Sequence, residues 1–97
     1  MARSGAIVVI LLAIVAGPAG AAGPPLGASS CSGCHASNAA VETPVPRLSG
    51  RPASEIVAAM QAFRDGKRPA TVMDRIAKGF SDAEIAAIAT WYAEQKP

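Results

Sequence analysis

Both cysteines and the single histidine of this 97-residue chain fall within one pentapeptide, Cys31-Ser32-Gly33-Cys34-His35. Two thiols separated by two residues can add to the two vinyl groups on one edge of a porphyrin. The histidine that follows can then present an imidazole nitrogen to the iron. This C-x-x-C-H spacing is the attachment signature of a c-type haem. We predict one covalent haem c, bound as thioethers by Cys31 and Cys34, with His35 as the proximal iron ligand.

Two other chemistries use a C-x-x-C pair. A thioredoxin-like redox pair is expected beside a βαβ pattern, and no segment of this sequence alternates with the period of a strand. A structural zinc site needs about four ligands, and the sequence contains no further cysteine or histidine. Both alternatives are therefore weaker than the haem prediction.

The first 21 residues have the three parts of a secretory signal. Arg3 supplies the positively charged N-terminal region, and residues 6–16 form an apolar run. Ala19-Gly20-Ala21 places small residues at a cleavage site. The apolar run is too short to cross a hydrocarbon core of roughly 30 Å as a helix. We therefore expect residues 1–21 to be a signal peptide. The mature chain, residues 22–97, should be periplasmic and have no membrane span.

The expected mature domain is small and nearly neutral. Without Arg3 it contains eight Lys and Arg against seven Asp and Glu, a net charge of +1. A nucleic-acid-binding domain would need a strong basic patch, so we expect no nucleic-acid partner. A domain of this size has a thin hydrophobic core, and a covalently attached haem is one kind of cross-link that compensates for it.

The apolar pattern predicts an all-α domain with three to four short helices. One helical turn fits residues 28–32, and the apolar face formed by positions 56, 57, 60 and 63 predicts a helix over 53–65, ended by Gly66. Residues 73–78 can form a short helix. Ser81 and Glu84 form a capping box that begins a helix ending near residue 94, with apolar positions 85, 88, 89 and 92 on one face. The stretch 36–50 is expected to be a loop.

The distal iron ligand must come from a residue other than histidine, because His35 is the only one. Met60 lies on the apolar face of the middle helix, where a methionine more often packs than ligates. Met73 follows the irregular segment 69–72, and a loop there can reach the far face of a haem. We predict Met73 as the distal ligand, with Met60, lysine ligation and an open site as alternatives.

Across residues 22–97 the chain resembles class I cytochromes c. It is most similar to the cytochrome subunit of flavocytochrome c sulfide dehydrogenase, through residues 60–73 (MQAFRDGKRPATVM) and 75–80 (RIAKGF). In that family the similar stretch leads to the methionine ligand, which corresponds to Met73. Pro46-x-Leu48-x-Gly50 resembles the family's proline loop, whose proline carbonyl accepts the proton of the proximal histidine. The resemblance thus gives that role to Pro46 and implies a small class I cytochrome c fold wrapped around one haem.

The resemblance also implies a function and partners. We expect periplasmic electron transfer by a cytochrome subunit that accepts electrons from an FAD-containing sulfide dehydrogenase subunit and passes them to a soluble acceptor such as another cytochrome. Such a subunit does no bond chemistry itself, and the sequence leaves its enzymatic role undecided. Two alternatives stay open: a free soluble monohaem carrier of the c4, c5 or c553 type, and a haem with an open distal site that binds peroxide or a small gas. The open site would lack a second histidine for acid–base chemistry.

The N-terminal part departs from the usual class I pattern. Class I chains have a longer first helix that crosses the last one, whereas Pro24, Pro25 and Gly27 leave room for little more than one turn. We therefore expect less packing between the two ends of this domain.

Two groups of basic residues have either a functional or an ordinary surface role. Arg47 and Arg51 can pair with a haem propionate, because the guanidinium fork matches a carboxylate. Four further cations flank Met73 and can form a docking rim around the haem edge. These are Lys67, Arg68, Arg75 and Lys78.

Overall fold

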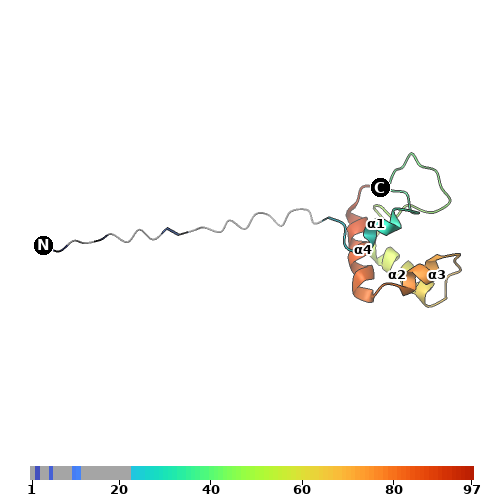
Figure 1. Cartoon of the computed structure of the whole chain (residues 1–97). Helices are drawn as coiled ribbons and strands as arrows, with labels where there is room; N and C mark the ends of the chain where they lie inside the picture. Colours follow the sequence, from blue (N-terminus) through green and yellow to red (C-terminus); the bar gives the residue numbers. More distant parts are fainter. Residues whose placement is uncertain (1, 3–4, 6–9, 12–22) are drawn as a thin grey trace.

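A computed structural model describes Ala2, Gly5, residues 10–11 and residues 23–97. The predicted signal peptide lies almost entirely outside the described residues. Over residues 23–97 four α-helices follow one another: α1 (Ala28–Cys31), α2 (Ala53–Arg64), α3 (Met73–Lys78) and α4 (Asp82–Glu94) (Figure 1). The described residues contain no strand, which confirms the all-α prediction. None of their helices has both the length and the apolar character needed to cross a membrane.

The glycine after α2 ends that helix as its sequence predicts. Gly66 has a φ of 71°, in the left-handed region that costs glycine little. The backbone N–H of Lys67 donates to the carbonyl of Ala62 at 2.9 Å, and that of Gly66 donates to the carbonyl of Phe63 at 3.3 Å. These two bonds form a Schellman motif. The motif turns the chain into the loop that leads to Met73.

The capping box at the start of α4 is confirmed. The Ser81 hydroxyl accepts from the backbone N–H of Glu84 at 3.2 Å, and the Glu84 carboxylate accepts from the backbone N–H of Ser81 at 2.9 Å. These hydrogen bonds hold the pKa of Glu84 below its usual value. The carboxylate therefore stays ionised near the positive end of the helix dipole, where a negative charge is favourable.

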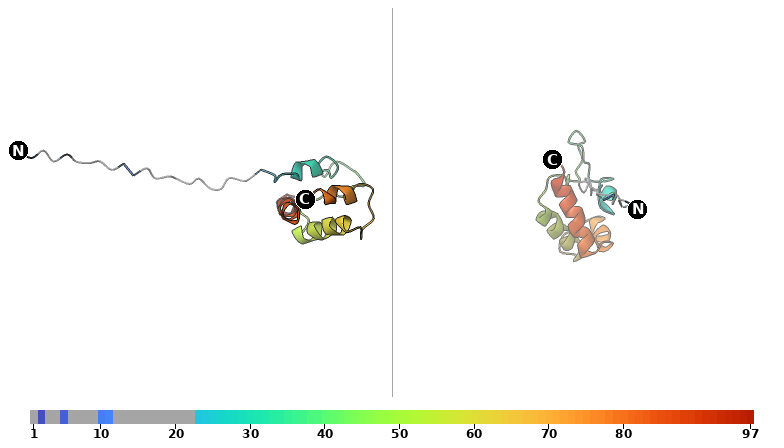
Figure 2. Two further views of the ribbon diagram at one scale, coloured as in Figure 1. Left: turned by 60° about the horizontal axis from the view of Figure 1, so that its bottom comes forward. Right: turned by 90° about the vertical axis from the view of Figure 1, so that its left-hand side faces the viewer.

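Helix α4 supplies most of the buried core. It packs against α1 and α2, while α3 packs against α2, and Figure 2 shows α4 end-on beside the other three helices. The four positions of its predicted stripe are buried: Ile85, Ile88, Ala89 and Tyr92. Three of them join Ala28 of α1 and Ile56 of α2 in one cluster. The fully buried core is thus small, as expected for a domain of this length.

A single turn of N-terminal helix still makes a close contact with the C-terminal half of the domain. Gly27 has a φ of 89°, and a Cβ atom there would lie 2.6 Å from Cε1 of Phe80, so only glycine permits this approach. The Tyr92 hydroxyl donates to the carbonyl oxygen of Ala28 at 2.5 Å and lies 2.8 Å from the hydroxyl of Ser32. Burial raises the pKa of Tyr92, so the phenol keeps the proton that it donates. The N-terminal and C-terminal parts of the domain therefore stay in contact, although the first helix is only one turn long.

The Tyr92→Phe substitution should lower the free energy of unfolding of the haem-loaded protein by about 1–3 kcal/mol, because it removes two hydrogen bonds made by a buried hydroxyl. Denaturant unfolding measures the change. The control is Ser32→Ala, which removes only the bond to the more exposed partner and should cost less. If the two variants lost the same free energy of unfolding, the hydrogen bond to the Ala28 carbonyl would not contribute to stability.

Candidate haem site

The C-x-x-C-H pentapeptide continues from the last residue of α1 into a tight turn. The backbone N–H groups of Cys34 and His35 both donate to the carbonyl of Cys31, at 3.1 and 2.8 Å. Cys31 is half-buried and packs against the core cluster, whereas Cys34 is exposed. Burial raises the pKa of the Cys31 thiol. One turn therefore offers one sulfur at the edge of the core and one at the surface, together with an imidazole, which suits a planar group attached along one edge.

Within the described residues the imidazole of His35 has one hydrogen bond, and it is short. Its Nδ1 lies 2.6 Å from the carbonyl oxygen of Pro46. Because a carbonyl can only accept, Nδ1 must carry the proton and donate it. Nε2 then keeps a free lone pair for a metal, and the hydrogen bond makes the ring a better electron donor. The ligand roles of His35 and Pro46 stay predictions, and this hydrogen bond is the geometry that they require.

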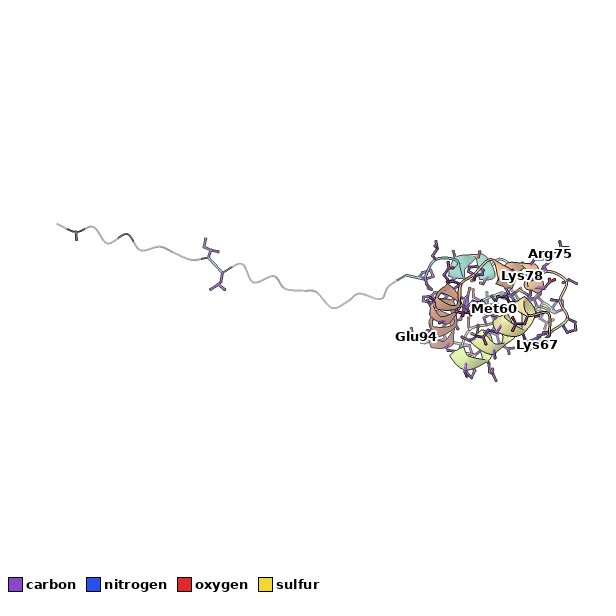
Figure 3. The ribbon with its side chains drawn as sticks, turned by 90° about the horizontal axis from the view of Figure 1, so that it is seen from below. Met60, Lys67, Arg75, Lys78 and Glu94 are labelled. Atoms are coloured by element: carbon purple, nitrogen blue, oxygen red, sulfur yellow. The ribbon has the colours of Figure 1, made fainter. Side chains whose placement is uncertain are left out.

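A hollow of about 610 Å³ lies where two loops face each other. Pro46 and Met73 both line it, so it brings the partner of His35 and the predicted distal ligand to one space. Its other lining residues are Pro44, Phe63, Arg68, Pro69, Ala70 and Thr71. Met60 does not line this hollow and packs against the buried cluster, and Figure 3 labels it in the middle of the helical domain. This placement favours Met73 over Met60 as a ligand.

The surrounding residues fit a haem in two respects. Several half-buried apolar side chains pack against the core cluster, including Leu48, Val57 and Phe80, and a porphyrin would cover their remaining apolar surface. The Nη1 atom of Arg47 is buried and has no hydrogen-bond partner among the described residues. A buried guanidinium nitrogen without a partner is costly, and a haem propionate has the charge and shape to satisfy it. Arg51 is held differently, with its Nε donating to the carbonyl of Arg47 at 2.7 Å.

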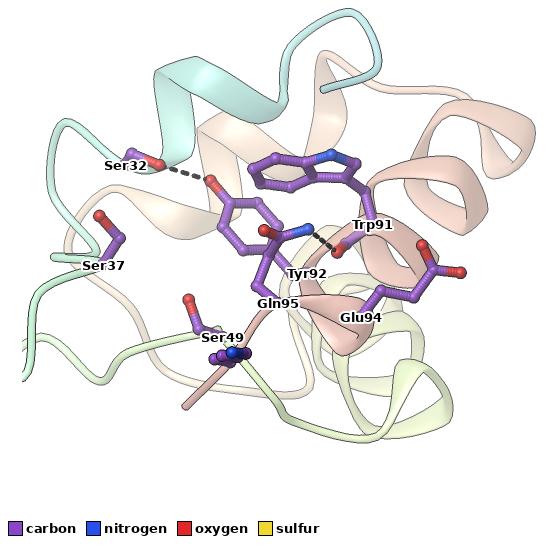
Figure 4. A pocket seen from close by; sticks show the side chains of 8 residues that line it. Ser32, Ser37, Ser49, Trp91, Tyr92, Glu94 and Gln95 are labelled. Carbon is purple, nitrogen blue, oxygen red and sulfur yellow. Dashed lines mark hydrogen bonds between the residues drawn. The ribbon is translucent and has the colours of Figure 1, made fainter. Parts of the chain in front are cut away.

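A second hollow, of about 600 Å³, lies at the C-terminal end of α4 (Figure 4). Trp91 meets the Tyr92 ring edge to face, with ring centroids 4.9 Å apart, and Gln95 donates to the carbonyl of Trp91 at 2.9 Å. The rest of the lining is mainly hydroxyl and charged groups, which suits a porphyrin poorly: Ser32, Ser37, Ser49, Glu94 and Lys96. Sequence reasoning missed the link from Ser32 to Tyr92, because no local pattern signals a contact between residues 60 positions apart.

The chain is similar to several known cytochromes and electron-transfer proteins. Residues 18–91 match the protein family described as "Cytochrome C oxidase, cbb3-type, subunit III". The chain is 37% identical over 84 residues to the "Thiosulfate dehydrogenase electron acceptor" of Thiomonas intermedia. It is 36% identical over 63 residues to the "Cytochrome subunit of sulfide dehydrogenase" of Chlorobaculum tepidum. It is also 35% identical over 71 residues to "Cytochrome c-554(548)" of Halomonas halodenitrificans.

The coverage of these relatives differs. The three alignments include 84%, 65% and 69% of this chain, but 39%, 57% and 86% of the respective relatives. The chain thus spans about half the length of the first two relatives and most of the third. The family match includes the C-x-x-C-H turn, α2, α3 and most of α4. The chain therefore belongs to the cytochrome c family and carries one covalent haem c.

Proposed function

We propose that this protein transfers single electrons in the periplasm through a haem c ligated by His35 and Met73. The observation that carries the proposal is the shared hollow: Pro46, whose carbonyl holds Nδ1 of His35, and Met73 line the same space. If His35 and Met73 both bind the iron, no position would be left on it for a substrate, which would suit electron transfer and not bond chemistry. The predicted signal peptide over residues 1–21 would account for export.

The haem supplies the one-electron redox chemistry, and the protein's own residues set its conditions. Pro46 fixes the orientation of the His35 ring and increases its basicity through the 2.6 Å hydrogen bond. A thioether ligand from Met73 favours the reduced state and raises the reduction potential. Arg47 offers a positive partner to a propionate. Cys31 and Cys34 would hold the group covalently.

The partner we propose is an FAD-containing sulfide dehydrogenase subunit. The flavin would take two electrons from sulfide, and this subunit would pass them one at a time to a soluble acceptor such as another cytochrome. The similarity to the sulfide dehydrogenase cytochrome subunit supports this proposal, since it extends over 65% of the chain. Residues 60–80, on which the family resemblance rests, contain the predicted distal ligand and α3.

A free electron carrier is the second candidate. Two relatives favour it: the thiosulfate dehydrogenase electron acceptor, and cytochrome c-554(548), of which the chain covers 86%. A fold of this class serves both bound and free carriers, so the fold alone does not choose between them.

Purification of the haem-loaded protein from its native periplasm tests the proposal. We expect a flavoprotein to co-purify and sulfide to reduce the haem in the complex. A monomeric cytochrome that neither binds a flavoprotein sulfide dehydrogenase subunit nor is reduced by sulfide in its presence would favour the free carrier. A high-spin ferric spectrum that shifts on addition of cyanide or CO would instead indicate an open distal site and contradict the His/Met assignment.

A further inference from the structure

A single cation lies at the hollow that Pro46 and Met73 share. Among the described residues that line this hollow, Arg68 is the only charged one. The guanidinium carbon of Arg68 lies 4.8 Å from the centre of the Phe63 ring, and Phe63 lines the same hollow. This is the distance of a cation–π contact. Arg68 forms no ion pair with an acidic residue of the described chain, so the contact with the Phe63 ring is what orients its side chain.

Arg68 also lies at the point where the chain leaves α2. Its backbone N–H donates to the carbonyl of Ala62 at 3.2 Å, and the N–H of Lys67 donates to the same oxygen at 2.9 Å. Pro69 follows, and a proline fixes its own φ and favours an extended conformation for the residue before it. The backbone and the side chain of Arg68 are therefore both tied to the last turn of α2.

The segment between Arg68 and α3 has few contacts of its own. No backbone N–H of residues 70–72 donates a hydrogen bond within the described part of the chain, and residues 69–72 are all exposed. The segment is thus fixed at its two ends, by Arg68 on one side and on the other by α3, which packs against α2. Met73 is the first residue of α3. If the Arg68 end came loose, the six residues of α3 alone would hold Met73 in place.

We propose that Arg68 is a positioning residue for Met73. Stacked on Phe63, its guanidinium holds the segment 69–72 against the end of α2, so that the thioether stays on the iron when another ligand competes for that position. Its charge has a second effect, because a cation beside the hollow favours the iron state of lower charge, which is the reduced one. The proposal rests on the ligation by His35 and Met73 proposed above.

The two effects depend on different properties of the arginine. The stack needs the flat guanidinium, which lysine lacks, whereas both side chains carry the charge. The first effect is limited in size, because a contact can bias ligation only by the free energy that it loses when the segment swings away. Arg68 is exposed and Phe63 is half-buried. For a cation–π contact of this kind we expect a factor of about three to ten in an equilibrium constant.

Imidazole is the probe for the positioning role. It is titrated into the ferric haem-loaded protein at a pH of about 8, where most of it is neutral, and loss of the far-red band expected of iron–methionine ligation measures displacement of Met73. Arg68→Ala should raise the apparent imidazole affinity about threefold to tenfold, and Arg68→Lys should raise it nearly as much. An unchanged affinity in Arg68→Ala, or full restoration of the original affinity in Arg68→Lys, would overturn the role of the stack.

Two matched variants separate positioning from general effects of charge and stability. Lys67→Ala removes the same charge one residue earlier, and in the described structure Lys67 neither stacks on Phe63 nor lines the hollow. Arg64→Ala breaks the ion pair with Asp82 and so removes a structural contact from the same end of α2. Neither variant should change the imidazole affinity. A rise in either one equal to that in Arg68→Ala would overturn the proposal.

A double-mutant cycle tests the route through Phe63. The Phe63→Leu substitution keeps an apolar side chain but removes the π face. If the two residues act through their contact, Arg68→Ala should have little further effect on the imidazole affinity in a protein that already carries Phe63→Leu. Two independent effects that simply multiply in the double variant would exclude the stack as the cause.

The reduction potential measures the effect of the charge. It should fall in Arg68→Ala and stay close to the original value in Arg68→Lys, and raising the ionic strength should narrow the difference. Equal potentials of Arg68→Ala and the unchanged protein would reject the charge effect. Failure of the proposed ligation would look different, because the unchanged ferric protein would then have no far-red band. A protein that has the band, but whose imidazole affinity does not depend on Arg68, would reject only the positioning role.

Discussion

Replacing Met73 with alanine should abolish the weak far-red absorption band expected of iron–methionine ligation in the ferric protein and lower the reduction potential. The physical reason is the thioether, a ligand that favours the reduced iron and raises the potential. Without it, the vacated position should bind cyanide or CO. Met73 is suited to this role because it lines the hollow that also contains Pro46, the partner of His35. Optical spectra and a redox titration measure both effects.

Met60→Ala is the matched control, since it removes the same side chain from a neighbouring helix. Met60 packs against the buried cluster, so its loss should cost about 2–5 kcal/mol in the free energy of unfolding and leave the far-red band in place. A band that survives in Met73→Ala, or disappears in Met60→Ala, would contradict the assignment.

The Cys31→Ala and Cys34→Ala variants should each sharply reduce the amount of folded, haem-containing protein. Each leaves at most one thioether, and the protein part alone has little buried apolar surface, with a central cluster of only five residues: Ala28, Ile56, Ile88, Ala89 and Tyr92. A core of this size gives small stability by itself. Haem content by optical spectroscopy and helical content by circular dichroism during heating measure the loss.

Ser30→Ala provides the comparison from the same turn, because Ser30 is exposed and, within the described structure, its hydroxyl donates only to the carbonyl of Gly27. It should retain its haem and melt close to the unchanged protein. An apo-protein of either cysteine variant that stays helical and melts cooperatively at the holoprotein's temperature would show that the haem is not needed for the fold.

The helical elements could be predicted from sequence because local chemistry fixes their ends. Ser81 and Glu84 cap α4, and Gly66 ends α2 in the left-handed conformation that the pattern anticipated. The expected helices over 53–65 and 73–78 agree with α2 and α3 to within one residue at each end. The resemblance placed Pro46 beside the proximal histidine, and the 2.6 Å contact of His35 fits that expectation.

The contacts between the two ends of the chain could not be predicted in this way. The sequence predicted a short α1 correctly, but the consequence drawn from it, weaker packing against α4, missed how Gly27 and Tyr92 compensate. Gly27 allows Phe80 to approach closely, and the Tyr92 hydroxyl reaches Ala28 across 64 positions of sequence. Such contacts depend on three-dimensional placement and leave no periodic signal. The buried Nη1 of Arg47, which has no hydrogen-bond partner in the part of the chain that the structure describes, is another feature that only the three-dimensional arrangement shows.

The bond between Tyr92 and Ala28 joins residues far apart in the sequence, which bears on the order in which the domain assembles. A contact across 64 positions closes a long loop, and such contacts are slow to form because chain entropy opposes them. During synthesis the N-terminal part of the chain emerges first, so Cys31, Cys34 and His35 are accessible before α4 has been made. Haem attachment can thus act on an open chain, and the docking of α4 then closes the finished site. We expect the contact of Tyr92 with Ala28 to form late in folding and to lie outside the folding nucleus.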